Sequence, residues 1–242
     1  MLIAPQNSLV AAALASNLLA LQQEIAATAH SASRSEDSVT LVAVSKGHAA
    51  DAVRSAAGLG LGNFGESYLQ EALPKMEQLR DLALTWHFIG RLQANKTRTI
   101  AEHFDWVHGI ERLQIAERLS AQRPHHAPPL QACLQVNIER EAAKGGVDPD
   151  DAEALALAVN ALPRLRLRGL MCILPEGRGM EADRRSFARL ATLQQQINAH
   201  GLALDALSMG MSGDFRAAIL EGATLIRIGT ALFGPRTAGP RS

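Results

Sequence analysis

The sequence has few cysteines and no excess charge of either sign. Its 242 residues include 2 cysteines, and 24 Lys and Arg balance 24 Asp and Glu. Cys133 and Cys172 both lie within apolar runs, without a CxxC pair or the Cys/His spacing of a zinc site. They are typical of reduced core thiols rather than of a disulfide scaffold. The zero net charge removes the general attraction that supplies most non-specific nucleic-acid affinity. We therefore expect neither a metal centre nor a nucleic-acid partner.

The sequence also lacks an uninterrupted apolar segment that could cross a membrane. The alanine- and leucine-rich stretch at residues 9–29 is broken by Asn17, Gln22 and Glu24. No Lys or Arg precedes Arg34, so the charged start of a secretory signal is missing as well. We expect an amphipathic helix over about residues 8–30 and a cytoplasmic protein without a membrane anchor.

No linker rich in Pro, Gly or Ser divides the chain, and apolar strand-like runs alternate with segments of helical spacing. This alternation supplies the crossovers that parallel strands need. Eight such units in about 250 residues are typical of a (β/α)8 TIM barrel, so we predict one barrel domain over residues 1–242. An open doubly wound sheet is the alternative, but no GxGxxG motif follows the first strand. The predicted strands are residues 41–45, 61–64, 85–89, 106–110, 130–138, 167–173, 206–208 and 224–228.

Residues that directly follow a strand are the candidate ligands, because the functional face of a TIM barrel is the one where strands end. Lys46 directly follows the first predicted strand. Partial desolvation at the barrel mouth favours the neutral amine that forms imines. Taken alone, however, an exposed lysine that ends a strand is the commoner explanation.

Two later segments carry candidate anion ligands. Ser212 lies in a glycine-rich run, where backbone N–H groups and a hydroxyl can hold a phosphate, although a simple turn explains the same residues. Arg227 shares a strand face with an apolar residue, so in a lumen its charge would need a partner. Gly229 and Thr230 follow it, and phosphate sites after the seventh and eighth strands are frequent in these barrels. Together with Lys46, they predict a phosphorylated carbonyl compound held through an imine.

These residues lie within longer motifs that strongly resemble the pyridoxal phosphate homeostasis proteins. The motifs are AVSK at 43–46, FGE at 64–66, WHFIG at 86–90, LQANK at 92–96, LRGLM at 167–171, LSMGMS at 207–212 and RIGTA at 227–231, with the spacing NxxxExxKxG at 137–146. They span nearly the whole chain in the expected order. The resemblance implies a single barrel similar to the N-terminal domain of alanine racemase, carrying pyridoxal 5'-phosphate (PLP).

By motif match, the resemblance implies that residues at the strand ends contact the cofactor: Lys46, Ser212, Arg227, Gly229, Thr230, His87 and Asn137. Lys46 would form a Schiff base with PLP. The serine, glycine and threonine would hold the phosphate, and Arg227 would face the pyridine nitrogen. A satisfied core histidine is an equally good explanation of His87.

The chain departs from the family pattern beside these residues. Ser67 stands where the family usually has Asn after Phe-Gly-Glu, and residues 47–49 read Gly-His-Ala where it commonly has Thr-Lys-Pro. Both departures lie near the predicted cofactor mouth, so they affect ligand details and leave Lys46 in place. Lys144 could accept the aldehyde during hand-off, but a solvated loop lysine is the simpler explanation.

The resemblance implies a protein of vitamin B6 balance that binds, buffers and delivers PLP without an established reaction. Its partners would be PLP and apo PLP-dependent enzymes, and we expect a monomer. A small PLP-dependent amino-acid racemase is the alternative, and a phosphosugar-binding barrel is a third.

Two features favour a carrier over a racemase. Arg227 cannot accept the ring proton that strengthens PLP as an electron sink. Racemisation also needs acid/base groups on both faces of the substrate. Racemases take the second group from a tyrosine of an additional domain, for which this length leaves no room. We expect Tyr68, the only tyrosine, to support its own loop.

Overall fold

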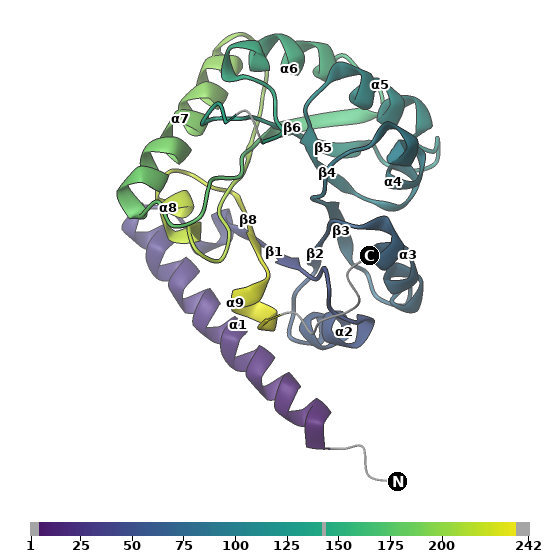
Figure 1. The fold of residues 1–242 in the computed structure, drawn as a ribbon, viewed down its shortest axis with the longest axis vertical. Coiled ribbons are helices and arrows are strands. Elements are labelled where there is room, and N and C mark those ends of the chain that lie inside the picture. Colours follow the sequence, from purple (N-terminus) through teal and green to yellow (C-terminus); the bar gives the residue numbers. More distant parts are fainter. Residues whose placement is uncertain (1–4, 142–143, 236–242) are drawn as a thin grey trace.

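Eight parallel strands, in sequence order, close into a barrel in the computed structural model, which describes residues 5–141 and 144–235 (Figure 1). Strands β1 (Thr40–Val44) and β8 (Leu225–Ile228) close it, with Thr40 opposite Leu225. This topology confirms the predicted (β/α)8 barrel. The other strands are β2 (Asn63–Glu66), β3 (Thr85–Phe88), β4 (Trp106–Ile110), β5 (Leu130–Gln135), β6 (Leu165–Met171) and β7 (Ala206–Ser208).

Helices cover the outside of the barrel, one or more after each strand (Figure 1). On α7, for example, Phe187, Leu190, Gln194 and Ile197 are buried at steps of three or four residues, the spacing of one helical face. The helices are α1 (Pro5–Ser31), α2 (Ala50–Gly58), α3 (Leu69–Gln78), α4 (Thr97–His103), α5 (Leu113–Gln122), α6 (Ala152–Asn160), α7 (Met180–Ala199), α8 (Phe215–Leu220) and α9 (Thr230–Phe233), with 3-10 turns η1 (Glu36–Ser38), η2 (Ala94–Lys96) and η3 (Pro149–Asp151).

Side chains of each strand alternate between the lumen and the helix layer, as the pleat requires. One apolar cluster, which includes Val42, Cys133 and Met171, fills part of the lumen. A larger cluster, which includes Ala43 and Phe64, lies between the strands and the helices. Burial on both faces explains why the strands are near-continuous apolar runs.

Helix α1 spans Pro5–Ser31, where the sequence predicts residues 8–30, and lies along α8 and α9 (Figure 1). Its buried residues recur every three or four positions: Leu14, Leu18, Leu21, Ile25 and Ala29. Asn17 Nδ2 donates to the Leu232 carbonyl at 3.0 Å, and Arg34 donates to the Ile219 and Ala223 carbonyls at 2.9 and 2.8 Å. The first helix is therefore attached to the last elements of the barrel.

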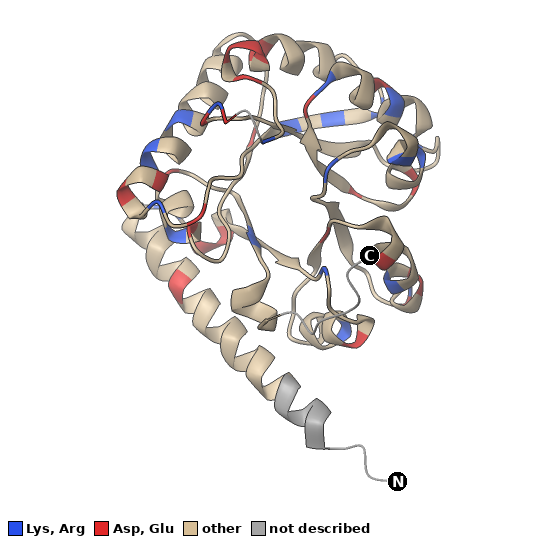
Figure 2. Ribbon diagram, viewed as in Figure 1, with Lys and Arg blue, Asp and Glu red and all other residues tan. Residues whose placement is uncertain are grey.

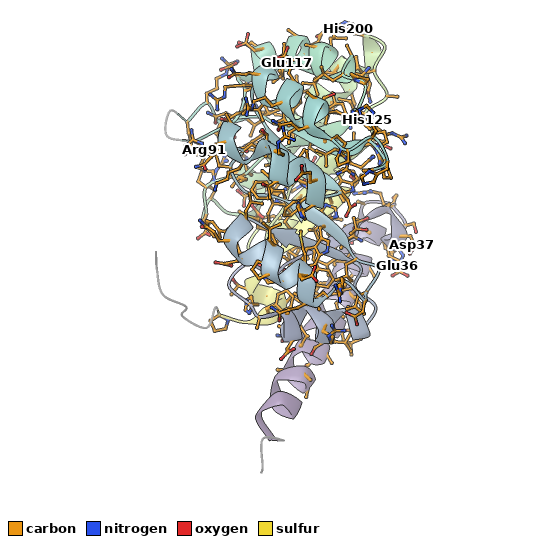
Figure 3. The ribbon with its side chains drawn as sticks, turned by 90° about the vertical axis from the view of Figure 1, so that its right-hand side faces the viewer. Glu36, Asp37, Arg91, Glu117, His125 and His200 are labelled. Carbon is orange, nitrogen blue, oxygen red and sulfur yellow. The ribbon has the colours of Figure 1, made fainter. Side chains whose placement is uncertain are left out.

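Charged residues lie mainly along the helices and loops outside the ring of strands (Figure 2). Arg91, Glu117, His125 and His200, for example, lie at the periphery of the molecule (Figure 3). Within residues 5–141 and 144–235, no helix is both long and apolar enough to cross a membrane. The few charges inside the ring are therefore the ones to examine for function.

Candidate cofactor site

A cavity of about 640 Å³ opens where the strands end, on the face that carries function in TIM barrels. Its walls come from the ends of β1, β3, β6, β7 and β8 and the loops after them. Among the lining residues are Lys46, Ser212, Arg227, Gly229 and Thr230. The fold thus brings together the predicted amine, the predicted buried cation and the predicted phosphate ligands.

The backbone on both sides of Lys46 is held in place. Ser45 is fully buried, its Oγ donates to Glu66 Oε1 at 2.7 Å, and Lys75 Nζ donates to the Ser45 carbonyl at 2.8 Å. On the other side, Gly47 takes a positive φ of 76° and its N–H donates to Glu71 Oε2 at 2.9 Å. Glycine suits this turn because side-chain-bearing residues are strained at positive φ. These contacts fix the point from which the Lys46 side chain enters the cavity.

A buried ion pair supports this turn from the helix layer. Lys75 of α3 pairs with Glu66 of β2, and the two side chains are 5% and 0% exposed. Burial raises the pKa of the Glu66 carboxyl, and the Lys75 ammonium opposes that rise. The pair lies behind the cavity wall and does not line the cavity.

Arg227 is a buried cation with neutral hydrogen-bond partners. Its guanidinium donates to the Ser208 carbonyl at 2.6 Å, to Ser208 Oγ at 2.7 Å and to the Cys172 carbonyl at 2.9 Å. Burial lowers the pKa of Arg227, although a guanidinium stays protonated in proteins. No carboxylate in residues 5–141 and 144–235 forms an ion pair with it. Asp214, which also lines the cavity, interacts with the Arg227 charge electrostatically without pairing with it, so Arg227 lines the cavity as a cation whose hydrogen-bond acceptors are all neutral oxygens.

The loops after β7 and β8 approach each other closely beside this cation. The Ala231 N–H donates to Ser212 Oγ at 3.3 Å and so links the two loops. Gly210 has a φ of +96°, and a Cβ there would lie 2.7 Å from the Ala218 side chain. A Cβ on Gly229 would lie 3.3 Å from the Val44 carbonyl. These glycines allow the backbone approach that phosphate cradles use.

The residues of the cavity fit a small phosphorylated aldehyde such as PLP. The volume lies within the usual range for ligand pockets of about 300–1,000 Å³. Lys46 supplies an amine, and the loops with Ser212, Gly229 and Thr230 supply polar groups at the wall made by β7 and β8. Arg227 supplies a buried donor for an acceptor atom of the ligand.

The structure does not place His87 in this cavity. His87 is 1% exposed, its ring stacks on Trp106 at 5.5 Å, and its nitrogens lie 3.0 Å from His108 Nε2 and 2.9 Å from Asn63 Oδ1. Burial lowers the pKa of His87 to about 3. These contacts match the core histidine that was the alternative explanation. The cavity wall on β3 is instead formed by Ile89, which follows the strand.

Asn137 lines a second cavity of about 700 Å³, which shares Ile89 and Ile173 with the first. Its Nδ2 donates to the Glu141 carbonyl at 2.8 Å, and its Oδ1 accepts from the Glu141 N–H at 3.1 Å. Lys144 also lines the second cavity, with its Nζ 3.1 Å from Glu141 Oε1. Asn137 therefore shapes the loop after β5 rather than the wall around Lys46.

Several residues at the cavity were not predicted as ligands. His48 lines the cavity, with its ring tilted against Phe233 at a centroid distance of 4.9 Å, and Asp183 and Glu176 line it from the region after β6. His48 lies two positions after Lys46, which was the available signal. Asp183 lies on a helix face, and its sequence position carries no comparable signal. Tyr68, by contrast, is 56% exposed and is not a lining residue.

Comparisons with known proteins show which family the chain is similar to. The model of the alanine racemase N-terminal domain family matches residues 13–237. The pyridoxal phosphate homeostasis protein of Pseudomonas aeruginosa is 55% identical over 226 residues, covering 93% of this chain and 97% of its own. That of Escherichia coli K12 is 46% identical over 233 residues, covering 92% and 97%. PipY of Synechococcus elongatus PCC7942, solved with PLP bound, is 39% identical with a TM-score of 0.80, covering 91% of this chain and 100% of its own.

Proposed function

The chain belongs to the pyridoxal phosphate homeostasis proteins of the alanine racemase N-terminal domain family, and from this we propose that it binds PLP reversibly through Lys46. In this proposal the protein limits free cofactor and delivers it to apo PLP-dependent enzymes. A relative, PipY, has been solved with PLP bound, and the residues that line the cavity at the barrel mouth of this chain suit that ligand.

One observation carries the proposal, namely that Lys46 and Arg227 line the same cavity as the joined loops after β7 and β8. When bound, PLP supplies an aldehyde that condenses reversibly with a lysine amine and releases one water. Lys46 provides that amine, and Ser212, Gly229 and Thr230 bind the phosphate. Arg227 donates a hydrogen bond to the pyridine nitrogen and so orients the ring.

The same residues support a carrier rather than a catalyst. Arg227 has only donors, so it cannot share a proton with the ring nitrogen as an acidic partner would. Racemisation needs a second acid/base group opposite Lys46. Tyr68 is mostly exposed and lies outside the cavity lining. These features leave Lys46 to hold the ligand and release it.

The attachment is tested by mixing the purified protein with PLP, reducing it with borohydride and mapping the pyridoxyl group by mass spectrometry. The group should be found on Lys46, and Lys46→Ala should lose both the group and the visible absorption of the bound cofactor. Lys96→Ala, outside the cavity, is the matched control and should keep both. Full labelling of the Lys46→Ala protein would overturn the assignment.

The carrier role is tested separately. The loaded protein should transfer PLP to an apo-enzyme added in equal amount, and it should elute as a monomer of 25.9 kDa on size exclusion. Sustained formation of D-alanine from L-alanine, lost in Lys46→Ala, would support the racemase alternative instead. The proposed cytoplasmic location is tested by cell fractionation.

A further inference from the structure

A continuous chain of hydrogen bonds crosses the barrel lumen from the cavity. Arg227 Nη1 lies 2.7 Å from Ser208 Oγ, and Ser208 Oγ lies 2.7 Å from His108 Nδ1. His108 Nε2 lies 3.0 Å from His87 Nδ1, and His87 Nε2 lies 2.9 Å from Asn63 Oδ1. The chain joins β8, β7, β4, β3 and β2, and only its Arg227 end lines the cavity.

Each hydrogen bond in this chain has a defined direction. Arg227 is always a donor, so Ser208 Oγ accepts from it and has its own hydrogen for His108 Nδ1. At the other end, Asn63 Oδ1 is an acceptor, so His87 Nε2 donates to it and His87 Nδ1 accepts from His108 Nε2. Both ends lead to the same arrangement, with each imidazole neutral and protonated at Nε2.

The surroundings keep both imidazoles neutral. Burial lowers the pKa of His87 to about 3, and burial, His87 and the Arg227 cation together lower the pKa of His108 far below its usual range. Trp106 of β4 packs against both rings, and Ser208 of β7 contacts His108. No carboxylate in the described ranges forms a hydrogen bond with either ring.

The direction of the chain decides how Ser208 meets Arg227. Because His108 Nδ1 takes the hydroxyl hydrogen, a lone pair of Ser208 Oγ faces the guanidinium. If His108 carried its proton on Nδ1, Ser208 Oγ would accept from both His108 and Arg227, and the hydroxyl hydrogen would have no acceptor in this network and could turn toward the guanidinium. A polar network inside an apolar lumen is stable only when every member is satisfied, and this one is satisfied throughout.

We propose that His108 and His87, acting through Ser208, are positioning residues that hold the Arg227 guanidinium toward the cofactor's ring nitrogen. The hydrogen-bond chain from Arg227 to Asn63 contains no acid that could pass a proton to that nitrogen. This inference rests on the proposed function, because the ring nitrogen is that of bound PLP. It assigns a binding role to three buried residues that do not themselves line the cavity.

The first test uses the protein without ligand. Long-range proton–nitrogen NMR should show His87 and His108 as neutral Nε2–H tautomers at pH 7, with signals assigned through His87→Gln and His108→Asn. An imidazolium or an Nδ1–H tautomer at either residue would overturn the hydrogen-bond directions assigned above.

The second test compares the release of nitrogen-15-labelled PLP from the wild type and from Ser208→Ala and His108→Phe. Borohydride should still trap the cofactor on Lys46 in each. Release should be about 3- to 10-fold faster, the effect of one net hydrogen bond on an equilibrium, and the ring nitrogen-15 shift should move. Met171→Leu, a change of similar volume elsewhere in the lumen, should leave both unchanged.

A conservative variant guards against a merely structural explanation. His108→Asn keeps an acceptor for the Ser208 hydroxyl, so its release rate and ring shift should lie nearer the wild type than those of His108→Phe. Trapping on Lys46 with unchanged shift and release in the variants would overturn the positioning role. Absence of trapping on Lys46 in the wild type would instead overturn the proposed function.

Discussion

Lys75 and Arg227 are both buried cations, but their hydrogen-bond partners differ. Lys75 is 5% exposed and Arg227 is 4% exposed. Lys75 lies between a helix and a strand and pairs with the Glu66 carboxylate. Arg227 lies in the lumen and hydrogen-bonds to neutral oxygens of Ser208 and Cys172.

We propose that the contrast separates a charge that stabilises the fold from one that binds a ligand. Removing a charge from water is costly, so buried charges are usually paired. Lys75 meets that requirement within the protein and secures the turn that carries Lys46. Arg227 forms hydrogen bonds to neutral oxygens instead of a salt bridge, and it also lines the cavity. We therefore expect mutations at the two positions to affect different quantities.

Breaking the fold-serving pair should have the largest effect. Glu66→Gln keeps the side-chain shape but leaves the Lys75 cation buried without a carboxylate, so the free energy of unfolding should fall by about 3–5 kcal/mol. Urea denaturation followed by circular dichroism measures it. The double variant with Lys75→Met should recover most of the loss, and a single variant as stable as the wild type would contradict the assignment.

Acid should have the second-largest effect on stability, because it protonates His87 in the hydrogen-bond network of the lumen. The pKa of His87 is lowered from 6.5 to about 3 on folding, so its contribution to stability is complete above pH 6.5 and is lost as pH falls toward 3. Between pH 6.5 and 4 this amounts to about 3 kcal/mol. Denaturation midpoints across this range should therefore fall less steeply in His87→Gln. The exposed His126→Gln should keep the wild-type slope, and an equal slope in both variants would reject the prediction.

Arg227→Met should show the opposite pattern from Glu66→Gln. PLP affinity should fall by about 1.5–3 kcal/mol, since the ring nitrogen loses a charged donor, whereas the stability of the ligand-free protein should change less than in Glu66→Gln. Equilibrium titration of the absorbance measures the first quantity, and urea denaturation measures the second. A large loss of stability with unchanged affinity would place Arg227 with Lys75 on the structural side.

The ion pair of Arg168 with Asp205 gives the reference cost of breaking a partly solvent-exposed pair. Arg168 donates to both carboxylate oxygens of Asp205 at 2.7 Å and lies 5.2 Å from the Trp106 ring centroid, but the Asp205 side chain is 54% exposed. Asp205→Asn should therefore cost only about 0.2–1 kcal/mol. The same urea denaturation checks it, and a cost as large as that of Glu66→Gln would show that burial is not what distinguishes these pairs.

The barrel was predictable from sequence because its strands are buried on both faces and so form apolar runs. Strand ends were less accurate where polar residues are buried. The second strand was predicted at residues 61–64 but spans Asn63–Glu66, because Glu66 is buried by pairing with Lys75 on the next helix. Periodicity does not show such a partner. Periodicity therefore places the end of β2 at residue 64, two residues before its end at Glu66.

Prediction of the site residues from sequence has the same limit. Lys46 and Arg227 stand out because each is a charge at or beside an apolar run. His108 is a lone polar residue in a strand, and its meaning depends on Ser208, one hundred residues away in the chain. A useful signal would be polar residues at lumen-facing positions of several strands, which requires the barrel register to be known.

Closure of the barrel by β1 and β8 also bears on when the protein can work during its own synthesis. The ribosome makes Lys46 early, but Arg227, Gly229 and Thr230 emerge after all the other strands. A nascent chain therefore contains Lys46 long before the cavity that Lys46 lines can form. Pairing between such distant segments is slow to form, so we expect the cavity to be complete only once the chain is nearly finished.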